Sequence, residues 1–100
     1  MRPLLHGDVS NAARALLASA PGRRQALCQQ MVREAELADR HVQRTGRLHP
    51  EWGNGSLMMA ARKYRLASEP GFDNVEFIEC FQTVLEQLKL ALLKDQRSNP

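Results

Sequence analysis

The chain has 100 residues, the usual size of one domain, and 43% of them are hydrophobic, which excludes a disordered tail. Only 5% are aromatic, so a core must rest on Leu, Ala, Val and Met, a composition that favours helices. Residues 1–66 carry eleven basic and five acidic side chains, whereas residues 67–100 carry three and six, so the net charge of +3 conceals an asymmetry. A basic body with an acidic final third favours one surface for polyanions and another for protein contact, although an ordinary solvated surface explains the charge equally well.

The first predicted helix begins at Asp8, a good N-cap, and ends at residues 21–22, a Pro-Gly pair. The second predicted helix is long, over residues 23–44, and Gly46 is its expected stop. Its apolar side chains repeat at helical spacing and predict a buried stripe of Leu27, Met31, Ala35, Ala38 and Val42.

Arginine recurs on the other side of the second helix. Arg33, Arg40, Arg44 and Arg47 have offsets of 0, 7, 11 and 14, and at about 100° per residue they fall within an arc of about 60°. Such stripes are commonly solvated surface, but a guanidinium fork also suits phosphate geometry. We therefore predict these four residues as candidate DNA contacts.

The loop over residues 44–65 holds the single Trp, the single Tyr and three of the six glycines. Pro50 favours an extended residue before it, and Gly53 and Gly55 tolerate positive φ, so a sharp reversal is expected. Trp52 then has three interpretations: a plug at a structural corner, a stacking surface for a nucleic-acid base together with His49, or a hot spot for a protein partner. The structural corner is the favoured interpretation.

The third predicted helix begins after Ser56 as N-cap and reaches about Ala67. It ends with a cationic cluster that either complements the helix dipole or contacts nucleic acid, with Tyr64 available to stack on a base. We predict the cluster as a second candidate DNA contact, formed by Arg62, Lys63 and Arg65.

The fourth predicted helix opens with Asp73 as N-cap and Glu76 at N3, and continues to about Lys94. Its flank of Phe77, Val84 and Ala91 adds width to an apolar seam. The combined stripe packs on the second helix within the monomer or continues into a subunit interface, and both alternatives stay open. The seam, predicted as an oligomer or partner interface, consists of Ile78, Phe81, Leu85, Leu88 and Leu92.

No pattern in the sequence predicts catalysis, a cofactor or a metal site. The three histidines are scattered, Cys28 and Cys80 lie 52 positions apart in no metal or redox motif, and the GNGS tetrapeptide lacks the lysine of a phosphate-binding loop. The cysteines are expected as small buried residues in a reducing compartment. No signal peptide precedes the first helix and no apolar run approaches the ~20 residues that span a bilayer, so we expect a cytoplasmic protein without a membrane partner.

Three segments resemble a family of short alphaproteobacterial proteins: RPLLHGDVSNAARALL, EAELADRHVQRTGRLHPEWGNGSLMMAA and CFQTVLEQL. That family in turn resembles the small terminase of gene transfer agents, a non-enzymatic subunit that forms rings, binds DNA and presents it to the large terminase. The resemblance implies weak binding of double-stranded DNA without sequence preference, a homo-oligomeric ring and a large terminase partner. The chain departs from the phage pattern because it has no short helix pair of the helix-turn-helix type.

Together these features predict one all-α domain over residues 1–100, with four helices. The long second and C-terminal helices are expected to pack as a hairpin-like bundle completed by oligomerisation. The expected function is a small-terminase-like DNA-packaging adaptor. The alternative is a helical protein-interaction module that uses the C-terminal amphipathic helix.

Overall fold

The computed structural model describes residues 2–98 and is all-α in that range. Its elements are α1 (His6–Leu17), a 3-10 turn η1 (Pro21–Arg23), α2 (Arg24–Thr45), α3 (Leu57–Ala61) and α4 (Val75–Ser98). The described residues contain one isolated antiparallel bridge, between His49 and Gly53, and no longer strand. The all-α expectation with four helices is confirmed.

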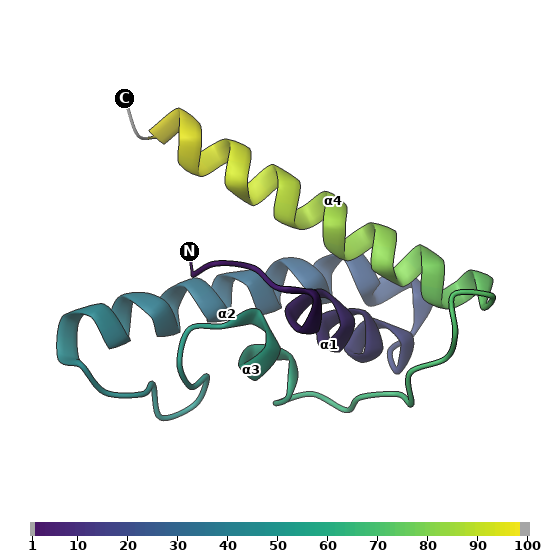
Figure 1. The fold of residues 1–100 in the computed structure, drawn as a ribbon, viewed down its shortest axis with the longest axis horizontal. Coiled ribbons are helices and arrows are strands. Elements are labelled where there is room, and N and C mark those ends of the chain that lie inside the picture. Colours follow the sequence, from purple (N-terminus) through teal and green to yellow (C-terminus); the bar gives the residue numbers. More distant parts are fainter. Residues whose placement is uncertain (1, 99–100) are drawn as a thin grey trace.

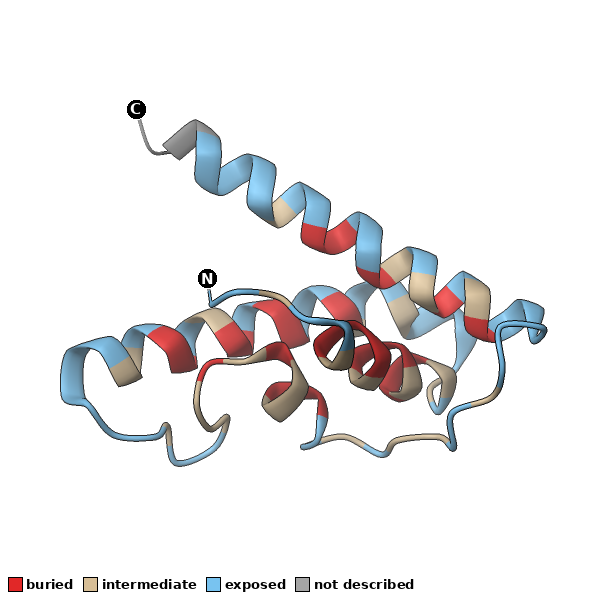
Figure 2. Ribbon diagram, in the orientation of Figure 1, coloured by how far each residue is buried: buried red, intermediate tan, exposed pale blue. Residues whose placement is uncertain are grey.

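Helix α1 lies at the centre of the molecule and contacts all three other helices (Figure 1). Helix α4 crosses above α1 and packs more extensively on α1 than on α2. The two long helices also pack directly on each other, as predicted, and α1 contacts both of them. The buried residues, red in Figure 2, converge on α1 from the other helices.

Helix α2 ends where the sequence predicts. Gly46 adopts φ 72°, and its amide donates to the Val42 carbonyl at 2.7 Å. A left-handed glycine at this position closes the last turn without the steric cost that a Cβ imposes. The predicted stripe faces the core, with Met31, Ala35 and Ala38 buried.

Asp8 stabilises helix ends in a different way from the one predicted. Helix α1 begins at His6, so Asp8 occupies the third helical position instead of the N-cap. Its Oδ2 accepts from the Leu5 amide at 2.8 Å, and its Oδ1 accepts from the Met58 amide at 2.9 Å. One carboxylate, only 5% exposed, thus accepts hydrogen bonds at the N-terminal ends of both α1 and α3.

Helix α3 is much shorter than predicted. Its N-cap is correct, since Ser56 Oγ accepts from the Met59 amide at 3.2 Å, but the helix ends at Ala61 instead of near Ala67. The following chain is held extended against α1. The Ala67 amide donates to the Arg14 carbonyl at 3.1 Å and Arg14 Nε donates to the Ala67 carbonyl at 2.8 Å, so tertiary bonds replace helical ones.

The N-cap of α4 lies one residue later than predicted. Asn74 Oδ1 accepts from the Phe77 amide at 2.9 Å, and the helix begins at Val75. Asp73 is exposed and lies outside the helix, so the predicted capping box of Asp73 and Glu76 is wrong. Both residues are strong N-cap formers, and only the path of the preceding turn selects Asn74.

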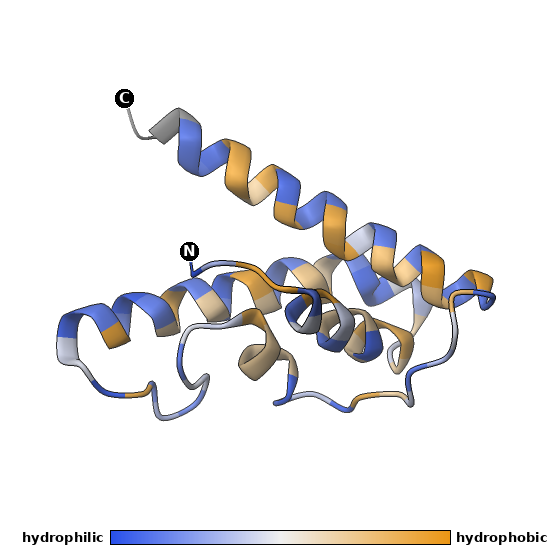
Figure 3. Cartoon of the chain, in the orientation of Figure 1, coloured by the Kyte–Doolittle hydropathy of each residue, from blue (hydrophilic) through white to orange (hydrophobic). Residues whose placement is uncertain are grey.

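Helix α4 buries its predicted flank more deeply than its predicted seam. Phe77 and Val84 are fully buried, whereas Leu85 is 51% and Leu92 is 42% exposed. Leu88 is an exception within the seam, because it is only 5% exposed and belongs to the core. Apolar residues therefore extend around α4 beyond the face that the monomer covers, as Figure 3 shows in orange.

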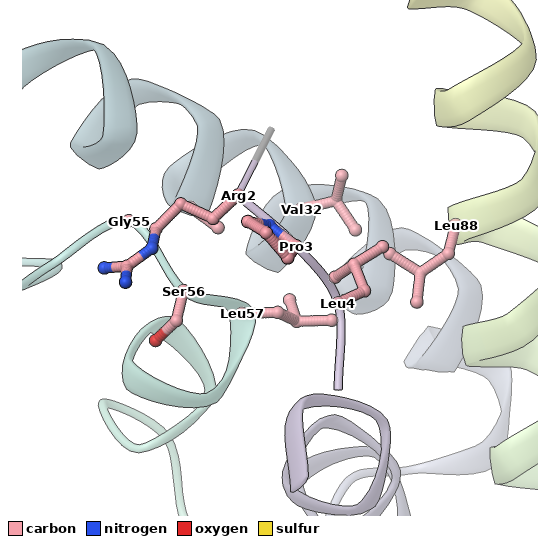
Figure 4. Close-up of a pocket in the computed structure, with 9 residues that line it drawn as sticks. Arg2, Pro3, Leu4, Val32, Gly55, Ser56, Leu57 and Leu88 are labelled. Atoms are coloured by element: carbon pink, nitrogen blue, oxygen red, sulfur yellow. The ribbon is translucent and has the colours of Figure 1, made fainter. Parts of the chain in front are cut away.

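The N-terminal segment crosses the molecule between α3 and α4 (Figure 4). Leu4 points into a cluster with Val32, Leu57 and Leu88, and the surrounding residues leave no free volume for a guest molecule. Arg2 extends the other way and donates from a terminal guanidinium nitrogen to the Asn54 carbonyl at 2.9 Å. The segment therefore fastens the residue 46–56 loop, α2 and α4 together.

Candidate nucleic-acid interface

The arginines divide into structural ones and exposed ones. Arg24 donates through Nε to the Leu16 carbonyl at 2.8 Å, at the carboxyl end of α1, and forms an ion pair with Glu76 of α4 at 3.3 Å. Arg14 holds the extended residue 65–70 segment through the Ala67 carbonyl. These side chains serve the fold, so the arginine content of the first 66 residues overstates the cationic surface.

Three arginines of the predicted stripe lie together on the outer face of α2. Arg33, Arg40 and Arg44 are all exposed, and at about 100° per residue they span an arc of about 40° opposite the buried stripe. The first and last are eleven positions apart, or about 16 Å along the helix at ~1.5 Å per residue. Within residues 2–98 none of the three guanidinium groups takes part in an ion pair. We call these three residues the α2 arginine stripe.

Arg47 is not part of that stripe. Gly46 ends the helix in a left-handed conformation, so the angular spacing of α2 does not extend to residue 47. Arg47 is exposed in the loop that follows, and its amide donates to Thr45 Oγ1 at 3.1 Å. Its predicted place on a continuous helical face is wrong, although its charge remains near the end of α2.

Acidic side chains lie beside one member of the stripe. A polar hollow of about 170 Å³ separates α2 from the last turns of α4, and its lining combines Arg40 with Glu36, Asp39, Gln43 and Asp95. These carboxylates offset part of the field of Arg40. Arg33 and Arg44 do not line the hollow, so the stripe keeps a cationic residue on either side of it.

The cationic cluster of Arg62, Lys63 and Arg65 lies in a turn against α2. All three side chains are exposed, and the residue between them, Tyr64, donates its hydroxyl to Glu34 Oε1 at 2.7 Å. Glu34 directly follows Arg33, so this hydrogen bond fixes the turn to α2 at the level of Arg33, about 100° around the helix from it. No local sequence pattern predicts this hydrogen bond, because its two partners are thirty positions apart.

The contacts of the Tyr64 hydroxyl argue against the prediction that this ring stacks on a nucleic-acid base. Burial raises the pKa of its hydroxyl to about 12, and the hydrogen bond to Glu34 and the carboxylate's charge act in the same direction. Gln30 Nε2 also donates to the phenol oxygen at 3.0 Å. With its hydroxyl held by α2 and its ring packed against the core, Tyr64 fastens the turn and is poorly placed to stack on a base.

The residue 46–56 loop forms the structural corner that the sequence favours. The His49 and Gly53 backbones pair in both directions, and His49 Nδ1 accepts from the Glu51 amide at 3.0 Å and the Trp52 amide at 3.2 Å. The Trp52 ring stacks on the His49 ring with 4.6 Å between centroids, and His49 meets His41 of α2 edge-on at 5.1 Å. Trp52 is half-buried, and one face of the His49 ring is already covered.

Glycine is required at one point of this corner. Gly55 has φ 93°, and a Cβ there would lie 2.6 Å from the Asp39 Cα of α2. The loop backbone therefore approaches the helix too closely for any other residue.

A separate apolar groove of about 600 Å³ lies between α4 and the N-terminal segment, and none of these arginines lines it. One wall is α4, with Phe81, Leu85 and Leu92. The other is formed by Leu4 and Leu5, which lead into α1, and by Val9 in the first turn of α1. Leu5 is 69% exposed, and Lys89 lies on the rim. Of the predicted interface residues, Ile78 is the one that does not line this groove; its side chain is partly buried.

The described residues contain no group of three or more metal-ligating side chains. Cys28 and Cys80 are buried thiols without a disulfide, and burial raises the pKa of Cys28 to about 12 and that of Cys80 above its ordinary value. Thiols in that state are poor nucleophiles. No helix in the described part of the chain is long and apolar enough to cross a bilayer.

Residues 2–88 match a protein family described as a domain of unknown function, DUF7742. The chain belongs to the DUF7742 family. The matched range of this DUF7742 chain covers α1 to α3, every candidate DNA contact and most of α4, and it ends before Leu92. No curated protein and no solved structure matches the DUF7742 chain.

Proposed function

We propose that this chain is a DNA-packaging adaptor similar to the small terminase of gene transfer agents. It binds double-stranded DNA weakly and without sequence preference, assembles with copies of itself, and presents the DNA to a large terminase in the cytoplasm. We propose no catalytic role and no cofactor.

The observation that carries the proposal is the α2 arginine stripe. Three guanidinium groups over about 16 Å of helix match the scale of the major groove, which is about 12 Å wide between its phosphates. They are exposed and engaged in no ion pair with any described residue. Exposed guanidinium groups without an ion-pair partner in the described part of the chain are available to replace the counterions of a phosphate backbone.

The cationic cluster of Arg62, Lys63 and Arg65 adds further candidate phosphate contacts to those of the α2 arginine stripe. The Tyr64–Glu34 hydrogen bond ties the turn that carries Arg62, Lys63 and Arg65 to α2 at the residue after Arg33. Two sets of basic side chains on one rigid fold contact more phosphates than either set alone, with no requirement for a particular base.

A mobility-shift titration at low salt tests the proposal. The wild-type chain should retard two unrelated duplexes equally, and the Arg40→Glu/Arg44→Glu variant should weaken both to the same degree. Absence of any shift at low salt contradicts DNA binding, and a strong preference for one duplex contradicts packaging without sequence selection.

One observation favours a second candidate, a protein-interaction module. The exposed leucines of α4 are typical of a helix that docks on a partner. In that case Leu85→Asp should abolish capture of the partner, while Arg40→Glu leaves capture unchanged. Leu88 is unsuitable for this test because its side chain is part of the core.

A further inference from the structure

The apolar groove beside α4 is a candidate interaction surface. It holds about 600 Å³ and is lined mainly by Leu, Val and Phe side chains from two separate segments. Aromatic contacts continue the apolar strip, since the Phe81 ring lies 6.0 Å from the His6 ring and 5.1 Å from the Phe72 ring between centroids. An exposed strip of this kind on a small chain marks an interaction surface.

We infer that the occupant of this groove is the same face of α4 from a second copy of the chain, lying antiparallel across a two-fold axis near Leu85. The inference extends the assembly step of the proposed function and rests on it. A two-fold contact uses one patch on both copies, so the patch must be complementary to itself.

The spacing of the strip meets that requirement. Ile78 and Leu92 lie seven positions before and after Leu85, so an antiparallel copy centred there places each Ile78 at the level of the other copy's Leu92. The seam is about 21 Å long at ~1.5 Å per residue. The leucines at its centre and C-terminal end are about half exposed in the single chain, and the second copy covers them.

The charges along α4 favour the antiparallel direction. Lys89 lines the groove, whereas Glu79 and Glu86 line a separate polar hollow between α4 and α2. In a parallel pair the two Lys89 side chains would lie at the same level and repel each other. With the axis near Leu85, each Lys89 instead comes to the level of position 81 in the antiparallel copy, so the two lysines are about 12 Å apart along the helices at ~1.5 Å per residue, and opposed helix dipoles favour the same direction.

The test is the mass in solution of three chains at the same concentration. The wild type should have twice the 11.3 kDa mass of one chain by light scattering. Leu85→Glu should be monomeric, whereas Leu90→Glu should remain dimeric, because Leu90 is equally exposed at 50% but does not line the groove. Circular dichroism checks that both variants keep their helices. A wild type that stays monomeric, or equal behaviour of the two variants, overturns the inference.

Cysteine cross-linking then tests the direction. A mixture of Ile78→Cys and Leu92→Cys chains should give disulfides between the two different variants, and Leu85→Cys should cross-link to itself. Cross-links of Ile78→Cys to itself would instead establish a parallel pair and overturn the antiparallel arrangement. Failure here is distinguishable from failure of the proposed function, because no residue of the α2 arginine stripe lines the groove and DNA binding of monomeric Leu85→Glu can be measured separately.

Discussion

Asp8 stabilises two helices at once, and its removal is the sharpest test of the fold. The carboxylate accepts the amide of Leu5 before α1 and the amide of Met58 at the start of α3. Replacement by alanine removes both acceptors at a site that is 5% exposed, so water replaces them poorly.

The expected cost follows from the two bonds. A hydrogen bond to a charged group contributes about 1.5–3 kcal/mol, and loss of a helix cap costs about 0.5–2 kcal/mol, so Asp8→Ala should lower the free energy of unfolding by about 2–4 kcal/mol. For a domain of this size that loss lowers the melting temperature by roughly 10–25 °C. Asp8→Asn keeps one carbonyl oxygen, so its cost should be about half.

The assay is urea unfolding followed by helical circular dichroism, with Asp73→Ala as control. Asp73 is an acid that the sequence equally predicts as an N-cap, but the structure leaves it exposed outside α4, so its replacement should cost less than about 0.5 kcal/mol. If Asp8→Ala is no more destabilising than Asp73→Ala, the two-helix role of this carboxylate is refuted.

Three other predictions use the same unfolding assay or a titration. Gly55→Ala should cost more than about 2 kcal/mol, because its positive φ and the close α2 backbone both oppose a Cβ, whereas Gly22→Ala faces open space and should be nearly neutral; equal costs would contradict the corner geometry. Asn74→Ala should cost about 1 kcal/mol as the true cap of α4, and no measurable loss would contradict that assignment. Tyr64, the only tyrosine, should ionise near pH 12 by ultraviolet absorbance, with Glu34→Gln lowering that pKa. Because the folded-state pKa lies above the ordinary value of about 10, this stabilisation is complete below pH ~10 and lost as the pH rises to about 12. A titration midpoint at the ordinary tyrosine pKa would contradict the hydrogen bond between Tyr64 and Glu34.

Helical periodicity and local end signals account for what the sequence predicted correctly. The bounds of α2, its stop at Gly46 and the Ser56 cap of α3 depend on residues near each other in the chain. The exposed side of α2 follows from the buried stripe, so the periodicity correctly predicts that Arg33, Arg40 and Arg44 share an exposed face. Helical spacing does not place Arg47 on this face, because α2 stops at Gly46 and the angular spacing ends with it.

Contacts between distant residues account for the rest. The short length of α3 depends on Arg14 and on the Tyr64–Glu34 bond, neither of which leaves a local pattern. The depth of burial around α4 depends on how the helix is rotated on α1, and a wide apolar stripe fits several rotations. The same limit hid the structural role of Arg24, because a sequence does not distinguish an arginine that caps a neighbouring helix from one that faces solvent.

The salt dependence of DNA binding tests the central claim most directly. Fluorescence anisotropy with a labelled duplex should give a Kd that rises steeply with salt, and Arg40→Gln/Arg44→Gln should weaken binding and reduce the slope of log K against log salt by about two. The control is Gln25→Glu/Gln82→Glu, which lowers the net charge by the same two units at exposed positions beside a polar hollow between α2 and α4. The account predicts an almost unchanged slope for the control. Equal effects of the two variants, or a wild-type chain that does not bind DNA at low salt, would contradict it.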